Sequence, residues 1–154
     1  MNNDSTKNLW KDFLNKHSEF ALEQTPKAGY FGDNEEDANA LASLISQEIK
    51  KATSHSLLGL QLREETLPKI GDFFIVTNWK GEAQSIIRTT SVKLMPYFSM
   101  HSEHARIEGE GDKSLVYWQK VHWDYYTREL EPFERLPRES MIVVFERFEL
   151  VYKI

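Results

Sequence analysis

The sequence predicts an α+β fold in which helices flank a small, mostly antiparallel and barrel-like sheet. Hydrophobic residues recur at helical spacing in the first fifty residues, whereas β-branched and aromatic residues dominate residues 73–95 and 141–152. The order helix, helix, hairpin, helix, strand is typical of an α+β domain. With 154 residues, 40% of them hydrophobic, the chain suffices for one core, so we expect a single domain over residues 1–154.

The N-terminal helices are predicted from hydrophobic periodicity and from the residues that bound it. A first helix should run from Thr6 to about Gln24, because Pro26 interrupts the pattern soon afterwards. Asn34 can cap a second helix, which has an acidic first turn and an apolar face that extends to Ile49.

Two more helices are expected in the second half of the chain. A short one over residues 99–108 should end at GEGD, residues 109–112, where two glycines release the backbone. A third long helix should then begin after Asp112 or Ser114, either of which can serve as its cap.

The predicted strands are rich in β-branched and aromatic residues. Residues 73–76 and 85–95 should form a hairpin around a polar turn with Gly81. Pro96 should end its second arm, because proline cannot donate a hydrogen bond to a neighbouring strand. Residues 141–152 should form the last strand.

Composition excludes several classes of function. The absence of cysteine excludes disulfides, thiol nucleophiles, iron–sulfur clusters and zinc sites built on cysteine. A net charge of -5 opposes binding to duplex DNA or to a membrane surface, since such binding needs many cations. No apolar run approaches the ~20 residues that span a bilayer, and the polar N-terminus does not have the pattern of a signal peptide. We therefore expect a cytoplasmic protein.

Residues 48–56, EIKKATSHS, combine two lysines with three hydroxyls and a histidine. Lysines in the last turn of a helix stabilise the negative end of its dipole, and Ser or Thr side chains form turns by bonding to their own backbone. The same residue types also activate a hydroxyl or bind a polar ligand. This stretch alone does not decide between the two interpretations.

Two further clusters have structural and functional interpretations. His101 and His104, with Glu108 nearby, would share a helical face and offer ligands to a divalent ion, but a third fixed ligand is missing, so we expect no metal and no cofactor. Residues 109–112 have the glycine spacing of a phosphate loop, but their two acids would repel phosphate. The aromatic residues that follow either pack in the core or line a groove for a base: Tyr117, Trp118, Trp123, Tyr125 and Tyr126.

Six segments together resemble the ASCH-domain family, in its branch of uncharacterised bacterial proteins of about this size. They are YFGD at 30–33, KKATSHSLL at 50–58, LPKIGD at 67–72, IIRTTSV at 86–92, EGEGDKSLVYWQKVHWDYYTREL at 108–130 and MIVVFERFELVY at 141–152. The resemblance covers nearly the whole chain in order. It implies a PUA-like fold, a small β-barrel flanked by helices, and recognition of RNA or of a modified nucleoside.

The family signature of glycine, lysine, threonine and arginine falls on Ile49, Lys51, Ser54 and Ser56, so only the lysine is unchanged. Some small members remove the acetyl group from acetylated cytidine with a lysine, a threonine and a glutamate, and the resemblance implies these catalytic roles for Lys51, Ser54 and Glu108. Ser54 would attack the acyl carbon, Lys51 would accept its proton if neutral, and Glu108 would assist the leaving amine. An ionised Glu108 would instead keep Lys51 charged, as a partner for the oxyanion.

The expected function is therefore hydrolysis of an acylated cytidine amide, or of single-stranded RNA, which is an activity attributed to larger members of the family. The alternative is a non-catalytic module that binds RNA or a modified base. It fits the loss of the signature glycine and arginine better, because binding tolerates imperfect geometry more readily than catalysis does. We expect substrate contacts from Lys50, Ser56, Arg88, Thr89, Thr90, Tyr30 and Trp118.

Overall fold

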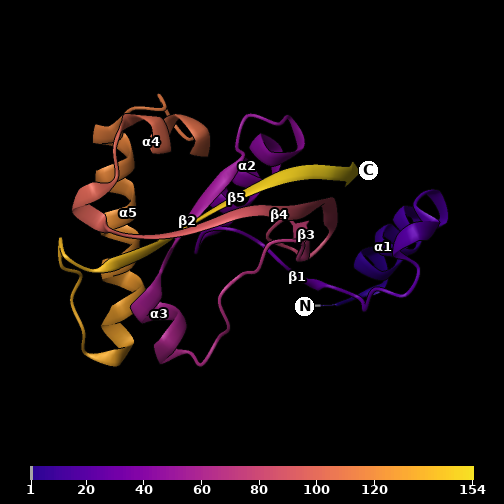
Figure 1. Ribbon diagram of the computed structural model, residues 1–154, viewed down its shortest axis with the longest axis horizontal. Coiled ribbons are helices and arrows are strands. Elements are labelled where there is room, and N and C mark those ends of the chain that lie inside the picture. Colours follow the sequence, from indigo (N-terminus) through magenta and orange to yellow (C-terminus); the bar gives the residue numbers. More distant parts are fainter. Residues whose placement is uncertain (1) are drawn as a thin grey trace.

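The computed structural model describes residues 2–154 and is built on a curled sheet of five strands that forms a half-barrel (Figure 1). The strands follow the spatial order β1-β3-β4-β5-β2. Only β1 and β3 are parallel, and the other neighbours are antiparallel. Irregular register in β3 and β4 adds curvature, because bulges bend and twist a strand. The predicted fold class is thus confirmed. The strands are β1 (Lys27–Gly29), β2 (Ala52–Ser56), β3 (Phe73–Thr77), β4 (Ala83–Pro96) and β5 (Ile142–Lys153).

Helices cover both ends of this sheet. Side chains of Asn3, Asn34 and Ser114 each accept a backbone N–H of the first turn and thereby cap α1, α2 and α5. The predicted cap at Asn34 is confirmed, and of the two residues expected as alternatives for the third long helix, Asp112 and Ser114, Ser114 is the cap. The helices are α1 (Asp4–Lys16), α2 (Glu35–Ser46), α3 (Leu57–Leu62), α4 (Ser102–Glu108) and α5 (Leu115–Leu130), with short 3-10 turns at Ser18–Phe20, Tyr97–Ser99 and Glu131–Phe133.

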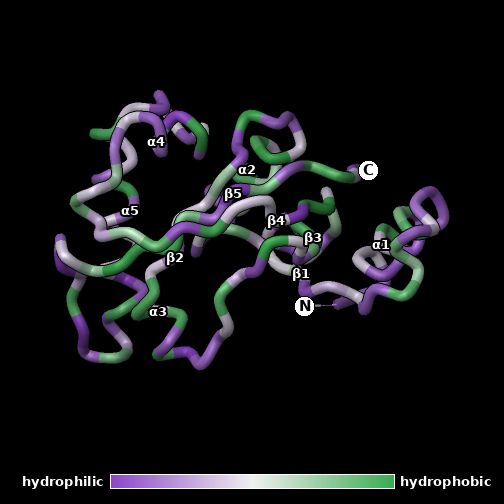
Figure 2. Tube along the Cα trace, viewed as in Figure 1, coloured by the Kyte–Doolittle hydropathy of each residue, from purple (hydrophilic) through white to green (hydrophobic). Residues whose placement is uncertain are grey.

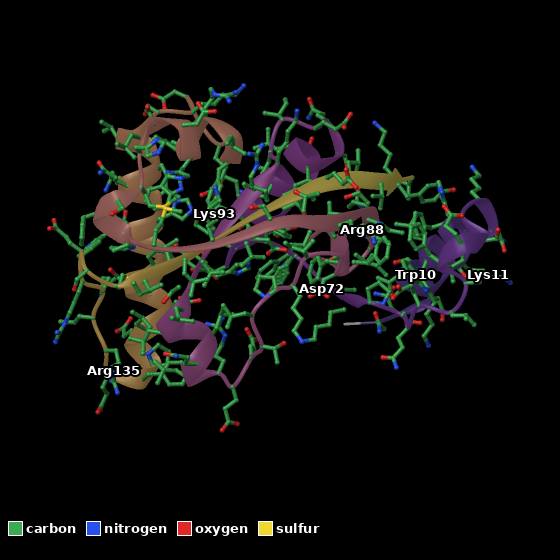
Figure 3. All side chains as sticks on the ribbon, viewed as in Figure 1. Trp10, Lys11, Asp72, Arg88, Lys93 and Arg135 are labelled. Carbon is green, nitrogen blue, oxygen red and sulfur yellow. The ribbon has the colours of Figure 1, made fainter. Side chains whose placement is uncertain are left out.

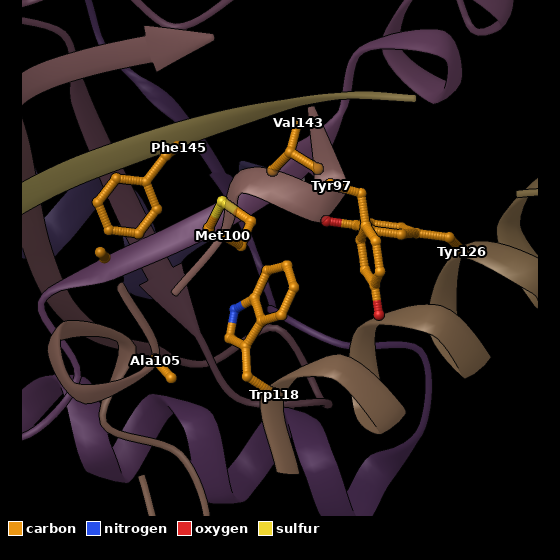
Figure 4. Packing of buried hydrophobic residues seen from close by; sticks show 8 residues of the cluster. Tyr97, Met100, Ala105, Trp118, Tyr126, Val143 and Phe145 are labelled. Atoms are coloured by element: carbon orange, nitrogen blue, oxygen red, sulfur yellow. The ribbon is translucent and has the colours of Figure 1, made fainter. Parts of the chain in front are cut away.

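Among the described residues 2–154, the core consists of three hydrophobic clusters along the sheet. One lies between α1 and β3–β4, a second lies under α2, and a third lies between α4, α5 and the paired strands β2 and β5. In this third cluster the rings of Tyr97, Trp118 and Phe145 pack with Met100 and Val143 (Figure 4). All three clusters pack against one sheet, so the sheet joins the end that holds α4 and α5 to the rest.

Three elements were not predicted, and three helices are shorter than expected, since α4 begins at Ser102 rather than at residue 99. The first helix ends at Lys16 rather than near Gln24, and the second ends at Ser46, before the two lysines. A turn with Glu48 in the left-handed conformation (φ 59°) separates the second helix from β2. The lysines therefore do not stabilise a helix end, because they lead into a strand. Strands β1 and β2 and helix α3 are short, and the strands form only by pairing with distant partners.

The hydropathy of the chain alternates at short intervals along the strands and helices (Figure 2). Within residues 2–154, every helix is too short or too polar to span a bilayer.

Candidate functional site

The site begins with the alternation of side chains along β2. One face of the strand is buried and carries Ala52, Ser54 and Ser56. Lys50, two residues before Ala52, continues this alternation and is buried as well. Lys51 has the opposite parity and is exposed. The strand therefore turns the ammonium of Lys50 and the hydroxyl of Ser54 toward α4 and α5.

Lys50 is almost fully buried, with 1% of its side chain exposed. Its Nζ donates to the carbonyl oxygen of Ala52 at 2.7 Å, to Glu110 Oε2 at 2.8 Å and to Glu108 Oε1 at 3.3 Å. These three acceptors match the three protons of an ammonium group. Lys50 is thus held as a fixed cation between two carboxylates.

Glu108, the last residue of α4, accepts hydrogen bonds on both carboxylate oxygens. Oε2 lies 2.5 Å from Ser54 Oγ and 2.5 Å from the indole Nε1 of Trp118. Oε1 lies 3.3 Å from Lys50 Nζ and 3.3 Å from His122 Nε2. Four donors from two separate segments, residues 50–54 and α5, converge on a carboxylate that has no solvent contact, and Tyr126 adds a bond to the Ser54 carbonyl at 2.8 Å.

The loop after α4 supplies the second carboxylate, and its glycines explain how it fits. A Cβ on Gly109 would lie 2.1 Å from the carbonyl oxygen of Ile49, and a Cβ on Gly111 would lie 2.5 Å from the ring of Tyr117. Both glycines also have positive φ. The loop can therefore close against the segment before Lys50, which places Glu110 beside the ammonium. The GEGD stretch separates two helices, as expected, and also delivers this acid.

The charges of the cluster reinforce one another. Burial disfavours the ionised form of Glu108, but the charges of His122 and Lys50 and the hydrogen bonds outweigh it and hold the pKa of Glu108 well below its ordinary value. Burial likewise lowers the pKa of Lys50, but its contacts with Glu110 and Glu108 raise it overall. Lys50 is therefore an ammonium and Glu108 a carboxylate at neutral pH.

Lys51, the lysine assigned by the family signature, does not reach this cluster. Its side chain is exposed, whereas its backbone N–H donates to Ile107 and its carbonyl accepts from Phe148. It lines a small pocket of about 140 Å³ together with Lys50, Ile45, Glu48, Phe148, Glu149 and Leu150. The preceding residue, Lys50, brings its amine into contact with Glu108, the acid that also contacts Ser54.

The signature fits the backbone better when it is moved one residue toward the N-terminus. Its glycine then falls on Glu48, which has the positive φ that glycine favours. Its lysine falls on Lys50 and its threonine on Thr53, while His55 takes the position of the arginine. Thr53, however, points to the face opposite Ser54, so the hydroxyl beside Glu108 is that of Ser54.

The remaining candidates on β2 and β4 make other contacts. Ser56 Oγ accepts the backbone N–H of Gly59 at 3.0 Å and caps α3. Thr89 Oγ1 donates to Glu146 Oε2 at 2.5 Å, and the other oxygen of Glu146 lies 2.7 Å from His55 Nε2. Thr90 is exposed beside the irregular register of β4. Ser56 thus has a structural role in the fold, and Thr89 belongs to a separate polar group on the opposite face of β2.

Arg88 and Tyr30 also lie away from Glu108. The guanidinium of Arg88 is 5.1 Å from the ring of Phe20 and 5.0 Å from the ring of Phe73, on the α1 side of the molecule (Figure 3). Tyr30 packs against Trp79 with ring centroids 4.6 Å apart. Of the seven substrate-contact candidates, only Lys50 and Trp118 contact Glu108.

The histidine pair at α4 is arranged for capping rather than for metal binding. Nδ1 of His101 accepts the backbone N–H of Glu103 at 3.3 Å, and Nδ1 of His104 accepts the N–H of His101 at 3.1 Å. Because each Nδ1 is an acceptor, the proton of each neutral ring lies on Nε2, which cannot then bind a metal.

A second group could offer ligands to an ion. Glu108, Glu110 and His122 place ligand atoms within 4.8 Å of one another. The Lys50 ammonium already contacts both carboxylates and occupies the place of a cation. These residues therefore fit an internal lysine better than a divalent ion.

Comparisons with known proteins agree with the fold. The ASCH domain family model matches residues 27–152. The crystal structure of an ASCH domain from Lactobacillus crispatus JV V101 is 33% identical, covers 97% of this chain and 96% of its own, and superposes with a TM-score of 0.91. Protein EF3133 from Enterococcus faecalis V583 is 32% identical over 97% of this chain and 89% of its own, with a TM-score of 0.87. A search of curated proteins finds no match. The chain belongs to the ASCH-domain family, which is generally thought to bind RNA.

Proposed function

We propose that this protein hydrolyses the amide bond of an acylated cytidine nucleoside at the cluster around Glu108. Lys50 takes the role that the family signature assigned to Lys51. The proposal is supported chiefly by the contact of 2.5 Å between Ser54 Oγ and Glu108 Oε2, beside a fixed ammonium. Burial of two carboxylates and a lysine is costly for stability alone, and such groups occur preferentially at functional sites.

The chemistry is an acyl transfer to Ser54 followed by hydrolysis. Ser54 Oγ forms a bond to the acyl carbon while its proton passes to Glu108, and the carbonyl oxygen becomes an oxyanion near the Lys50 ammonium. Glu108 then gives the proton to the exocyclic nitrogen, the carbon–nitrogen bond breaks and cytidine leaves. Water then forms a bond to the acyl carbon while its proton passes to Glu108, the bond between that carbon and Ser54 Oγ breaks, and Glu108 returns the proton to Ser54 Oγ.

The low pKa of Glu108 affects the two halves of this reaction differently. A carboxylate with a lowered pKa is a weak base, so it accepts the Ser54 proton only as the new carbon–oxygen bond forms. The carboxyl group formed in this way is a strong acid, and it readily protonates the leaving nitrogen. Lys50 remains charged, so it stabilises the oxyanion and is not the base.

The surroundings favour an uncharged nucleoside over a phosphodiester. Glu110 is the more exposed carboxylate of the cluster, with 15% of its side chain accessible, so a ligand would approach Lys50 by displacing it. The pKa of nearby Tyr117 is raised by burial and by the charges of Glu110, Asp37 and Asp112. Acids on this side would repel a phosphate group, whereas a neutral acyl amide meets no such barrier.

The test is an assay with paired variants at adjacent positions. Purified protein is incubated with N4-acetylcytidine, and free cytidine is measured by chromatography. Lys50→Met and Ser54→Ala should each lower turnover by at least about 100-fold. Lys51→Met, at an exposed position, and Thr53→Ala, on the opposite face of the strand, should retain turnover. Equal losses in Lys51→Met and Lys50→Met would refute this assignment of the site.

A non-catalytic binding module is the second candidate. It is supported by the complete hydrogen bonding of Glu108, whose two oxygens already accept four donors without a ligand. A carboxylate in this state resembles a structural network as much as a base. Thermal-shift measurements with nucleosides and short single-stranded RNA separate the two: stabilisation without release of cytidine supports binding, and product formation supports hydrolysis.

A further inference from the structure

His122 lies in α5 one helical turn after Trp118, and only 8% of the residue is exposed. Its ring stacks on the indole of Trp118 with centroids 4.2 Å apart and planes 17° from parallel. The edge of the ring faces Glu108, at 3.3 Å from Oε1. The proposed reaction assigns no proton transfer to His122, so its presence in the cluster needs an explanation.

The two ring nitrogens of His122 both face oxygens that carry no proton. Nδ1 lies 2.9 Å from the carbonyl oxygen of Trp118, and Nε2 faces the Glu108 carboxylate. A neutral imidazole has one N–H, so one of its nitrogens would direct a lone pair at an oxygen. The protonated ring donates to both, and its positive charge is placed beside a buried negative one.

Charged groups from α4, from the loop after it and from the segment before β2 act on His122. Glu108 at the end of α4 and Glu110 in the following loop favour the imidazolium, whereas Lys50, which precedes β2, opposes it. Tyr126 on α5 contributes an uncharged ring with its centroid 5.9 Å away. The two carboxylates, Glu108 and Glu110, thus balance the two cations, Lys50 and His122. Burial alone would lower the pKa of His122, but contact with Glu108 outweighs burial, so this pKa lies above its ordinary value.

We infer that His122 is a positively charged positioning residue, which holds Glu108 ionised and directs one carboxylate oxygen to Ser54. His122 and Lys50 occupy Oε1, so Oε2 is left for Ser54 and for the indole of Trp118. His122 keeps both of its protons throughout the reaction and acts through its charge. The catalytic part of this inference rests on the proposed hydrolysis, whereas the charge state can be measured without a substrate.

The charge is measured by nitrogen NMR titration of the imidazole rings in the wild-type protein. His122 should carry both ring protons at neutral pH and titrate above 6.5, its ordinary pKa. In Glu108→Gln the midpoint should fall, because the countercharge is lost. In Trp118→Phe, which removes a neutral donor from the same carboxylate, it should stay. A ring that is already neutral at about pH 6 in the wild type would overturn the inference.

The positioning role is measured by the pH dependence of kcat/KM. His122→Gln keeps a polar N–H group but removes the charge, so Glu108 should bind a proton at higher pH. The acid limb of the kcat/KM profile should therefore move to higher pH by at least about one unit, so kcat/KM on that limb should fall about tenfold. Trp118→Phe removes one neutral donor from the same carboxylate, so it should move the acid limb in the same direction but by less than His122→Gln.

The outcomes separate the two proposals. An unchanged acid limb in His122→Gln would refute the positioning role even if the protein is an active hydrolase. Absence of turnover in the wild-type protein would refute the reaction and any catalytic role of His122 with it, whereas a doubly protonated ring in the NMR titration would still establish the buried cation.

Discussion

Replacement of Lys50 by methionine tests whether the buried cluster is organised as the geometry indicates. The substitution keeps a long apolar side chain and removes the ammonium that lies 2.7 Å from the Ala52 carbonyl, 2.8 Å from Glu110 and 3.3 Å from Glu108. Glu108 has no solvent contact, so it would lose one of its two countercharges without gaining water. Removing one partner of a buried ion pair costs about 3–5 kcal/mol.

The matched control is Lys51→Met, at the neighbouring exposed position. It should change the free energy of unfolding by less than about 0.5 kcal/mol. For a chain of this size, a loss of 3–5 kcal/mol corresponds to a melting temperature lower by about 6–20 °C. Urea unfolding at neutral pH, followed by circular dichroism, measures both variants.

The difference between the two lysine variants should depend on pH. It should shrink at acid pH, where Glu108 binds a proton and its unpaired negative charge in Lys50→Met is lost. A Lys50→Met protein as stable as Lys51→Met at neutral pH would refute the conclusion that the buried Lys50 ammonium stabilises the ionised Glu108.

Three further effects should be measurable in the folded chain. The pKa of His122 is raised on folding, so the contribution of His122 to stability is complete below its ordinary pKa of 6.5 and is lost as the pH rises through the folded pKa. Urea titrations at about pH 6 and about pH 9 should show this decline in the free energy of unfolding. A flat profile would contradict it. Ser56→Ala removes the cap of α3 and should cost about 1 kcal/mol in the same assay, whereas an unchanged midpoint would argue against the cap. Gly109→Ala should lower the melting temperature more than Gly71→Ala does. Both glycines have positive φ, but only at Gly109 would a Cβ lie 2.1 Å from a backbone oxygen, that of Ile49. Equal losses in melting temperature would contradict the close approach.

Features that depend on neighbouring residues were predictable. Asn34 and Ser114 cap their helices as expected, because an N-cap bond joins residues only two or three positions apart. The long strands β4 and β5 were recognisable from their β-branched and aromatic residues. Strands β1 and β2 were not, since three to five residues carry little pattern and their pairing partners β3 and β5 are distant in the chain.

The contacts of the candidate site were predictable in part. Ser54 and Glu108 were named together from the resemblance to the family, and the structure brings them into contact. The lysine that contacts Glu108 is Lys50 rather than the predicted Lys51, and the sequence does not distinguish them, because the two residues are chemically identical and differ only in strand parity. His122 was overlooked as part of the site, although it lies four residues from both Trp118 and Tyr126 on one face of α5.

The sequence by itself determined the family, the fold class, the helix caps and the supply of an amine, a hydroxyl and a carboxylate. These follow from local interactions and from the order of recognisable segments. Only the tertiary structure decided which lysine is buried and that Glu110 and His122 join it. The reason is that burial changes the charge balance of each group, and burial is produced by the packing of β2 against α4 and α5, which are distant from β2 in the chain.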